Sequence, residues 1–107
     1  MSRYIILILL FSLTSFSCKQ PAIIESNEAV GLLENDDYYF LDVRTLKEHN
    51  TKSIPNTACI PVQKIEQRIE EIAQYKDKKI IVYCRSGNRS GIATKILNQN
   101  GFDAYNM

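Results

Sequence analysis

The residues best suited to chemistry form one short segment, Cys84-Arg85-Ser86-Gly87-Asn88-Arg89-Ser90. A glycine-containing loop that bends back over Cys84 can turn its backbone N–H groups toward the sulfur and form a nest for an anion. A helix after such a loop directs its positive end to the same point, and the guanidiniums of Arg85 and Arg89 add charge. All three features favour the thiolate, so we expect the pKa of Cys84 to lie below the free value of about 8.5. The segment therefore predicts a nucleophile for a small anionic substrate.

The sequence around this segment alternates between strand-like and helix-like stretches. Apolar runs rich in branched or aromatic residues predict strands at 38–43, 58–60, 80–83 and 102–105. Helices are predicted after a cap at Ser26 and along the apolar stripes of 62–72 and 92–97, whereas the polar residues 45–56 predict an irregular loop. This alternation predicts an α/β fold, a small parallel sheet with helices on both faces. Cys84 would follow the carboxyl end of a strand, where such sheets bind ligands.

Several further segments, in this order and spacing, resemble the rhodanese-like family. The active-site loop of that family is similar to residues 84–90, and its "LDVR" segment is similar to Leu41-Asp42-Val43-Arg44. An acidic-aromatic pair matches Glu48-His49. The paired Ile-Pro steps and the closing "GF…VYN" match three more segments, Ile54-Pro55, Ile60-Pro61 and Gly101-Phe102-Asp103-Ala104-Tyr105-Asn106-Met107.

The resemblance implies a sulfurtransferase that works through a persulfide on Cys84. The thiolate takes the outer sulfur of a donor such as thiosulfate and passes it to a thiophilic acceptor, cyanide or a thiol. The loop amides would hold the persulfide, with Ser86 and Ser90 as additional donors and Arg85 and Arg89 on the sulfonate of the donor. Gly87 and Asn88 complete the implied binding loop, and the chemistry needs no metal or organic cofactor.

Two alternatives remain from the residues themselves. The six residues from Cys84 to Arg89 are one fewer than in the similar loop of dual-specificity phosphatases, which disfavours phosphatase or arsenate reductase chemistry. The chain also departs from the family pattern, with Lys52-Ser53 and Asn56-Thr57 where Gly-His and Gly-Ala are usual. It stops at Met107, where the family usually continues, so we expect a C-terminally shortened domain. A binding or persulfide-carrying module without turnover is therefore the second hypothesis.

Residues outside the loop have more modest expected roles. Asp42 and Arg44, at a strand end, predict a structural ion pair, with a supporting role at the site as the alternative. His49 is expected to be exposed to solvent rather than to act as a general base. Cys59 is expected to pack in the core, and whether it could instead form a disulfide with Cys84 is left open. Three scattered cysteines do not predict a zinc site.

The first residues predict export rather than a part of the fold. Arg3 precedes the apolar run 4–13, which is too short to span a bilayer but typical of a secretory signal. Cys18 ends a lipobox-like sequence, so we expect a signal peptide over 1–18, a lipid anchor on Cys18, a tether over 19–24 and one domain over 25–107; ordinary cleavage nearby is the alternative. We expect a monomeric periplasmic or cell-surface lipoprotein. With 13 Lys and Arg against 12 Asp and Glu, the charge balance gives no reason to expect nucleic-acid binding.

Overall fold

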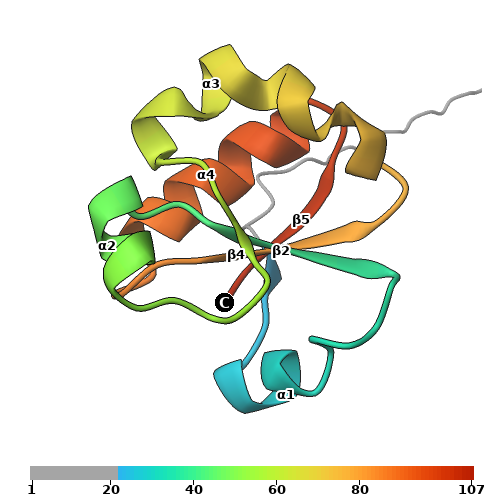
Figure 1. Ribbon diagram of the computed structural model, residues 1–107. Coiled ribbons are helices and arrows are strands. Elements are labelled where there is room, and N and C mark those ends of the chain that lie inside the picture. Colours follow the sequence, from blue (N-terminus) through green and yellow to red (C-terminus); the bar gives the residue numbers. More distant parts are fainter. Residues whose placement is uncertain (1–21) are drawn as a thin grey trace, which may run out of the picture.

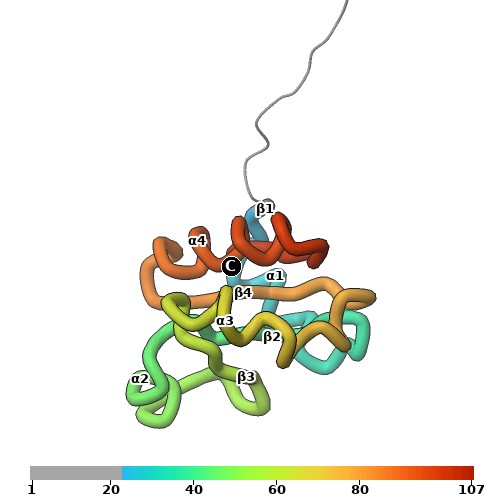
Figure 2. The backbone as a smooth tube through the Cα atoms, turned by 90° about the horizontal axis from the view of Figure 1, so that it is seen from above, coloured from blue at the N-terminus to red at the C-terminus, as the bar shows by residue number. Residues whose placement is uncertain are grey.

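Five parallel strands form one sheet at the centre of the computed structural model, which describes residues 22–107. The predicted signal peptide, Cys18 and the start of the predicted tether lie outside these residues. The strand order is β1-β5-β4-β2-β3, so the strand that leads to Cys84 is central in the sheet (Figure 2). The strands are β1 Ala22–Ile23, β2 Tyr38–Asp42, β3 Ala58–Cys59, β4 Lys79–Tyr83 and β5 Asp103–Asn106.

Helices cover both faces of the sheet, as the alternating pattern predicts (Figure 1). One face carries α3 and α4, and the opposite face carries the short α1. The helices are α1 Ser26–Val30, α2 Leu46–Thr51, α3 Ile65–Arg68 and α4 Asn88–Gln99, with 3₁₀ segments η2 Val62–Lys64 and η3 Ile69–Tyr75 on either side of α3. No helix within the described residues is both long and apolar enough to cross a membrane.

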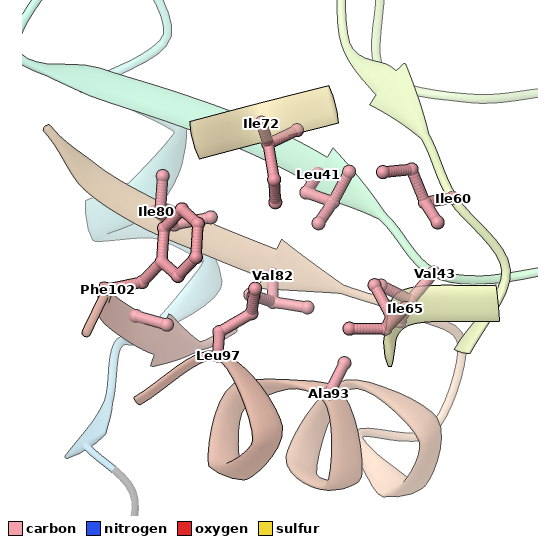
Figure 3. Close-up of a cluster of buried hydrophobic side chains, with 11 residues drawn as sticks. Leu41, Val43, Ile60, Ile65, Ile72, Ile80, Val82, Ala93, Leu97 and Phe102 are labelled. Atoms are coloured by element: carbon pink, nitrogen blue, oxygen red, sulfur yellow. The ribbon is translucent and has the colours of Figure 1, made fainter. Parts of the chain in front are cut away.

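The two faces of the sheet bury unequal cores. Alternate side chains of a strand point to opposite faces, so Ile80 and Val82 join the larger cluster while Ile81 joins the smaller one. The larger cluster lies between the sheet and the α3–α4 layer (Figure 3). The smaller cluster lies between the sheet and α1 and consists of Ala29, Phe40 and Ile81. Most of β2 and β4 is buried on both faces, so Tyr38–Leu41 and Ile80–Tyr83 carry no charge, which is why the sequence predicted these strands well.

The predicted irregular loop over 45–56 is wrong, because it contains α2. Thr45 and Glu48 close a capping box: the Thr45 hydroxyl accepts from the Glu48 N–H at 3.1 Å, and the Glu48 carboxylate accepts from the Thr45 N–H at 2.9 Å. This arrangement satisfies two backbone donors at the start of a short, polar helix that has no apolar face to reveal it.

Three smaller expectations also need correction. The stripe over 62–72 does bury Ile65 and Ile72, but the helix is split among η2, α3 and η3. Ser26 is the first residue of α1 rather than its cap, a position that Glu25 occupies. The predicted tether is part of the sheet at its end, since the backbone of Ala22–Ile23 pairs with β5.

Candidate active site

Cys84 directly follows β4 and lies at the carboxyl edge of the sheet. The backbone reverses at Gly87, whose φ of 89° is a left-handed conformation that an L-residue adopts only at a cost of about 1–2 kcal/mol. After this reversal α4 begins, and two backbone donors point at Cys84 Sγ, the Gly87 N–H at 3.1 Å and the Ser90 N–H at 3.4 Å. The Ser90 hydroxyl lies 3.3 Å from the same sulfur. The predicted inward-turned amides are therefore present.

These donors set the ionisation of the thiol. Partial burial of Cys84 raises its pKa, but hydrogen bonds from the Ser90 hydroxyl and from the N–H groups of Ser90, Gly87 and Ser86 outweigh that effect, and the pKa is lowered. Each of these donors is electrically neutral. The thiolate of Cys84 is thus favoured mainly by hydrogen bonds. The sequence also predicted a contribution from the guanidiniums of Arg85 and Arg89, which is not among the main causes.

We call the Gly87 N–H, the Ser90 N–H and the Ser90 hydroxyl around Cys84 Sγ the cradle. Asn106, at the end of β5, holds this cradle in place. Its Oδ1 accepts from the Ser90 hydroxyl, and its Nδ2 donates to the Gly87 carbonyl at 3.2 Å. One side chain therefore links the turn to the start of α4. The sequence reasoning gave Asn106 no site role, although a polar residue at the end of the last parallel strand reaches the same sheet edge as Cys84.

The two arginines of the loop have different environments. Arg89 donates to both carboxylate oxygens of Glu48, at 2.8 and 3.1 Å, and this pair is the main reason why the pKa of Glu48 is lowered to about 2. Arg85 is exposed and makes no ion pair within residues 22–107. Of the two predicted donor-binding cations, Arg85 thus carries a charge without an acidic partner among the described residues, whereas Arg89 has one.

The other predicted loop residues lie at the surface. Ser86 and Asn88 are exposed, and the Ser86 hydroxyl accepts from the Asn88 N–H at 3.4 Å. The Ser86 side chain is therefore engaged within the loop, while its backbone N–H is the part that favours the thiolate.

A buried ion pair between Asp42 and Arg44, which the sequence predicted, lies at the end of the neighbouring strand β2. The Asp42 carboxylate is fully buried and accepts from Arg44 Nε and Nη2 at 2.7 to 3.1 Å and from the Arg44 N–H at 2.9 Å. Desolvation raises the pKa of Asp42, but these bonds and one from His49 outweigh it, so the pKa is lowered. Arg44 Nη2 also donates to the Lys52 carbonyl at 2.7 Å, which ties the segment after α2 to the sheet.

The expectation that His49 is exposed to solvent is wrong. Its side chain is 17% exposed, and its Nδ1 lies 2.9 Å from Asp42 Oδ2. The reason is α2, whose turn brings His49 over the end of β2. An irregular loop would have given the His49 side chain no fixed partner, which is why the sequence predicted that it is exposed.

One set of potential metal ligands comes together at the same strand end. Single ligand atoms of Asp42, His49 and Cys59 lie within 4.8 Å of one another. The Arg44 guanidinium already binds both oxygens of the Asp42 carboxylate, so a cation there would have to displace it. Asp42 and His49 are better described as part of the structural ion pair, with the Cys59 thiol beside it, than as ligands of a metal centre.

Cys59 and Cys84 are both half-buried free thiols. The pKa of Cys59 is raised, mainly by burial and next by the negative charge of Asp42. Its Sγ donates to the Arg44 carbonyl at 3.6 Å. The strand β2 lies between β3 and β4, so the two cysteines are separated by about two strand spacings, roughly 10 Å. A disulfide needs Cα atoms within about 7 Å, so the backbone would have to move to form one.

An open groove of about 430 Å³ runs beside Cys84. Its lining is Arg44, Lys52, Ser53, Ile54, Pro55, Tyr83 and Cys84. The Tyr83 hydroxyl accepts from the Ile54 N–H at 3.2 Å and lies 2.8 Å from Thr57 Oγ1, so it holds the segment from Ile54 to Thr57 against the end of β4. Asn56 replaces the family's usual glycine at a φ of 64°, a conformation that asparagine tolerates better than most residues.

Comparisons with known proteins agree on one family. The model of the "Rhodanese-like domain" matches residues 25–107. A "Sulfurtransferase" of Allochromatium vinosum is 37% identical over 71 residues, which are 66% of this chain and 64% of the relative. A "tRNA uridine(34) hydroxylase" of Cronobacter sakazakii is 30% identical over 83 residues, but the chain spans only 24% of that protein.

Solved structures show the same similarity. A rhodanese-related protein from Thermoplasma volcanium matches with a TM-score of 0.70 and 30% identity, covering 78% of this chain and 80% of that one. The reduced CoADR-RHD of Bacillus anthracis matches with a TM-score of 0.74 and 28% identity over 81% of this chain, which corresponds to 15% of that larger chain.

Proposed function

Because this chain belongs to the rhodanese-like family, we propose that it is a sulfurtransferase that carries one sulfane sulfur atom as a persulfide on Cys84. The observation that supports this most strongly is the convergence of neutral donors on Cys84 Sγ. A thiolate is both the nucleophile that takes sulfur and the leaving group that gives it up, so stabilising it serves both halves of the reaction.

In the first half-reaction, the Cys84 thiolate attacks the outer sulfur of thiosulfate or a similar anionic donor. A new S–S bond forms at Sγ, the S–S bond of the donor breaks, and sulfite leaves with the electron pair. The small ring of amides suits a single sulfur atom better than a tetrahedral phosphate. Arg85, the loop cation without an acidic partner among the described residues, would attract the donor anion.

In the second half-reaction, a thiolate acceptor attacks the outer sulfur of the persulfide. The bond to Cys84 Sγ breaks, its electron pair returns to Sγ, and the cradle stabilises the thiolate again. No general base near Cys84 is required, because the cradle already favours the ionised sulfur.

Phosphatase chemistry fits the site less well. A guanidinium that binds a phosphate must have its donors available, whereas Arg89 donates to both oxygens of Glu48. The loop is also one residue shorter than in the similar phosphatases. We therefore assign Arg89 to holding the loop in shape rather than to binding the donor.

The test is the intact mass of the protein after incubation with thiosulfate. We expect a gain of one sulfur atom that disappears on adding cyanide. Cys84→Ser should show no adduct, and Cys59→Ser should behave like the unchanged protein. A folded protein that binds thiosulfate but never gains sulfur would refute turnover and favour the binding-module hypothesis; circular dichroism establishes that the protein is folded.

We also propose that the domain works outside the cytoplasm, anchored by a lipid on Cys18. Support comes from the sequence alone, the apolar run 4–13 followed by the lipobox-like cysteine. Labelled fatty acid should be incorporated into the protein in a bacterial host and lost in Cys18→Ser. Cleavage without label incorporation would favour an ordinary signal peptide instead.

A further inference from the structure

We propose that the groove beside Cys84 binds the sulfur acceptor, and that this acceptor is a small thiol with an apolar body and a negatively charged end. The inference rests on the proposed function, since it names the acceptor class for the persulfide. It starts from the position of the groove. Cys84 lines it, so a molecule in the groove lies beside the reacting residue, while the other lining residues are distinct from the donors to Cys84 Sγ.

The size of the groove argues against a very small occupant. One water molecule takes about 30 Å³ of liquid volume, whereas the groove offers about 430 Å³. Cyanide or thiosulfate would leave most of it empty. The volume lies in the lower part of the range of about 300–1,000 Å³ found for pockets that bind organic ligands.

The walls of the groove are mainly apolar and are fixed in place. Ile54, Pro55 and Tyr83 line it, and the Tyr83 hydroxyl is held by hydrogen bonds with Ile54 and Thr57. The Thr57 hydroxyl also donates to the Ile54 carbonyl at 2.8 Å, which closes the turn. A preformed apolar wall binds an alkyl chain without the cost of ordering the protein first.

The charges along the groove indicate which chemical group the other end of the ligand carries. Arg44 is neutralised by Asp42, and the described residues that line the groove include no acidic one. Lys52 is exposed and forms no ion pair within the described residues, while its carbonyl is held by Arg44. The groove therefore combines an apolar wall with one uncompensated positive charge, which suits a carboxylate at the end of a short apolar chain.

The experiment separates the two half-reactions. The protein is first loaded with thiosulfate, freed of excess donor, and shown by mass to carry the persulfide. Transfer rates are then measured with 6-mercaptohexanoate, 6-mercaptohexanol and 2-mercaptoethanol, each divided by the rate of the same thiol with a small-molecule persulfide. We expect the hexanol to react about tenfold faster than the ethanol, because an open groove would bury less than half of the area of its four extra methylenes, and the hexanoate to be up to about fivefold faster again.

Matched variants assign these preferences to the groove. Lys52→Gln should abolish the advantage of the hexanoate over the hexanol, whereas Lys95→Gln, which removes an exposed lysine from α4, should leave it unchanged. Ile54→Ala should reduce the advantage of the hexanol without affecting the ethanol. Equal corrected rates for all three thiols, or equal effects of the two lysine changes, would overturn the proposal.

A binding measurement keeps the inference independent of turnover. Heptanoate, which lacks the thiol, should shift the backbone amide NMR signals of residues 52–54, 56 and 57, and Lys52→Gln should weaken this binding. If no persulfide forms but these shifts appear, the proposed function fails and the ligand class of the groove stands. If the persulfide forms and heptanoate leaves these amides unchanged, the sulfurtransferase stands and the groove assignment fails.

Discussion

Replacing Ser90 by alanine tests whether neutral hydrogen bonds activate Cys84. Ser90 is fully buried, and its single hydroxyl proton has two acceptors, Asn106 Oδ1 and Cys84 Sγ, the sulfur lying 3.3 Å from Ser90 Oγ. Alanine fits the same space but removes this hydroxyl, the one side-chain group that contacts Sγ as a possible donor among residues 22–107. The pKa of Cys84 should therefore rise, and the sulfur should be less ionised at neutral pH.

The size of the effect follows from the kind of bond that is lost. A hydrogen bond to a charged group contributes about 1.5–3 kcal/mol. The lower end applies here, because sulfur is a weak acceptor, Cys84 is only half-buried and two backbone donors remain. Since about 1.4 kcal/mol corresponds to a factor of ten, the alkylation rate of Cys84 at neutral pH should fall about tenfold.

The assay is the rate of alkylation by iodoacetamide as a function of pH, in a Cys59→Ser background so that only Cys84 is followed within the domain. Thr94→Val is the matched control. It removes another buried hydroxyl of α4, which donates to the Ser90 carbonyl at 2.7 Å and does not contact the sulfur. The Ser90→Ala and unchanged profiles should converge at alkaline pH, where both sulfurs are ionised. Coincident profiles at neutral pH, or an equal slowing by Thr94→Val, would refute the reasoning.

Three further substitutions test the surroundings of the cradle. Gly87→Ala should lower the free energy of unfolding by about 1–2 kcal/mol in denaturant titrations, because φ is 89° even though the new Cβ would meet no atom within 4 Å; an unchanged midpoint would contradict this. Asp42→Asn should cost about 3 kcal/mol in the same assay by leaving the Arg44 guanidinium without its buried partner, and a neutral result would show that the pair is dispensable. The pKa of Glu48 falls from 4.5 to about 2 on folding, so its contribution to stability is present above pH 4.5 and is lost as pH falls toward 2. The stability difference between the unchanged protein and Glu48→Gln should shrink across that window, and a constant difference would show that the carboxylate charge is irrelevant.

The sequence predicted the parts of the site whose signals are local. The strand before Cys84 is apolar without interruption, and the loop after it holds its glycine, serines and arginines within seven residues. Both the position of Cys84 at the sheet edge and the inward-turned amides followed from that order. The ion pair of Asp42 and Arg44 was equally local, being two residues apart at a strand end.

The parts that the sequence did not predict depend on contacts across the fold. Arg89 pairs with Glu48, 41 residues earlier, and nothing local indicates that this cation is already engaged. The error over α2 was avoidable, since Thr45 and Glu48 have the spacing of a capping box. That helix in turn determines the environment of His49, so one missed helix also produced the wrong expectation for the histidine.

Glu48 connects the two halves of the proposed site. Its carboxylate caps the first turn of α2 and binds Arg89 of the loop, while α2 leads directly to Lys52 at the groove. Arg44 makes a second connection by binding both Asp42 and the Lys52 carbonyl. The charged side chains thus fix the position of the groove relative to the loop, whereas the groups that bind the sulfur itself are neutral donors. This division suits a group that alternates between thiolate and persulfide, because the negative charge can leave and return to Sγ without breaking an ion pair.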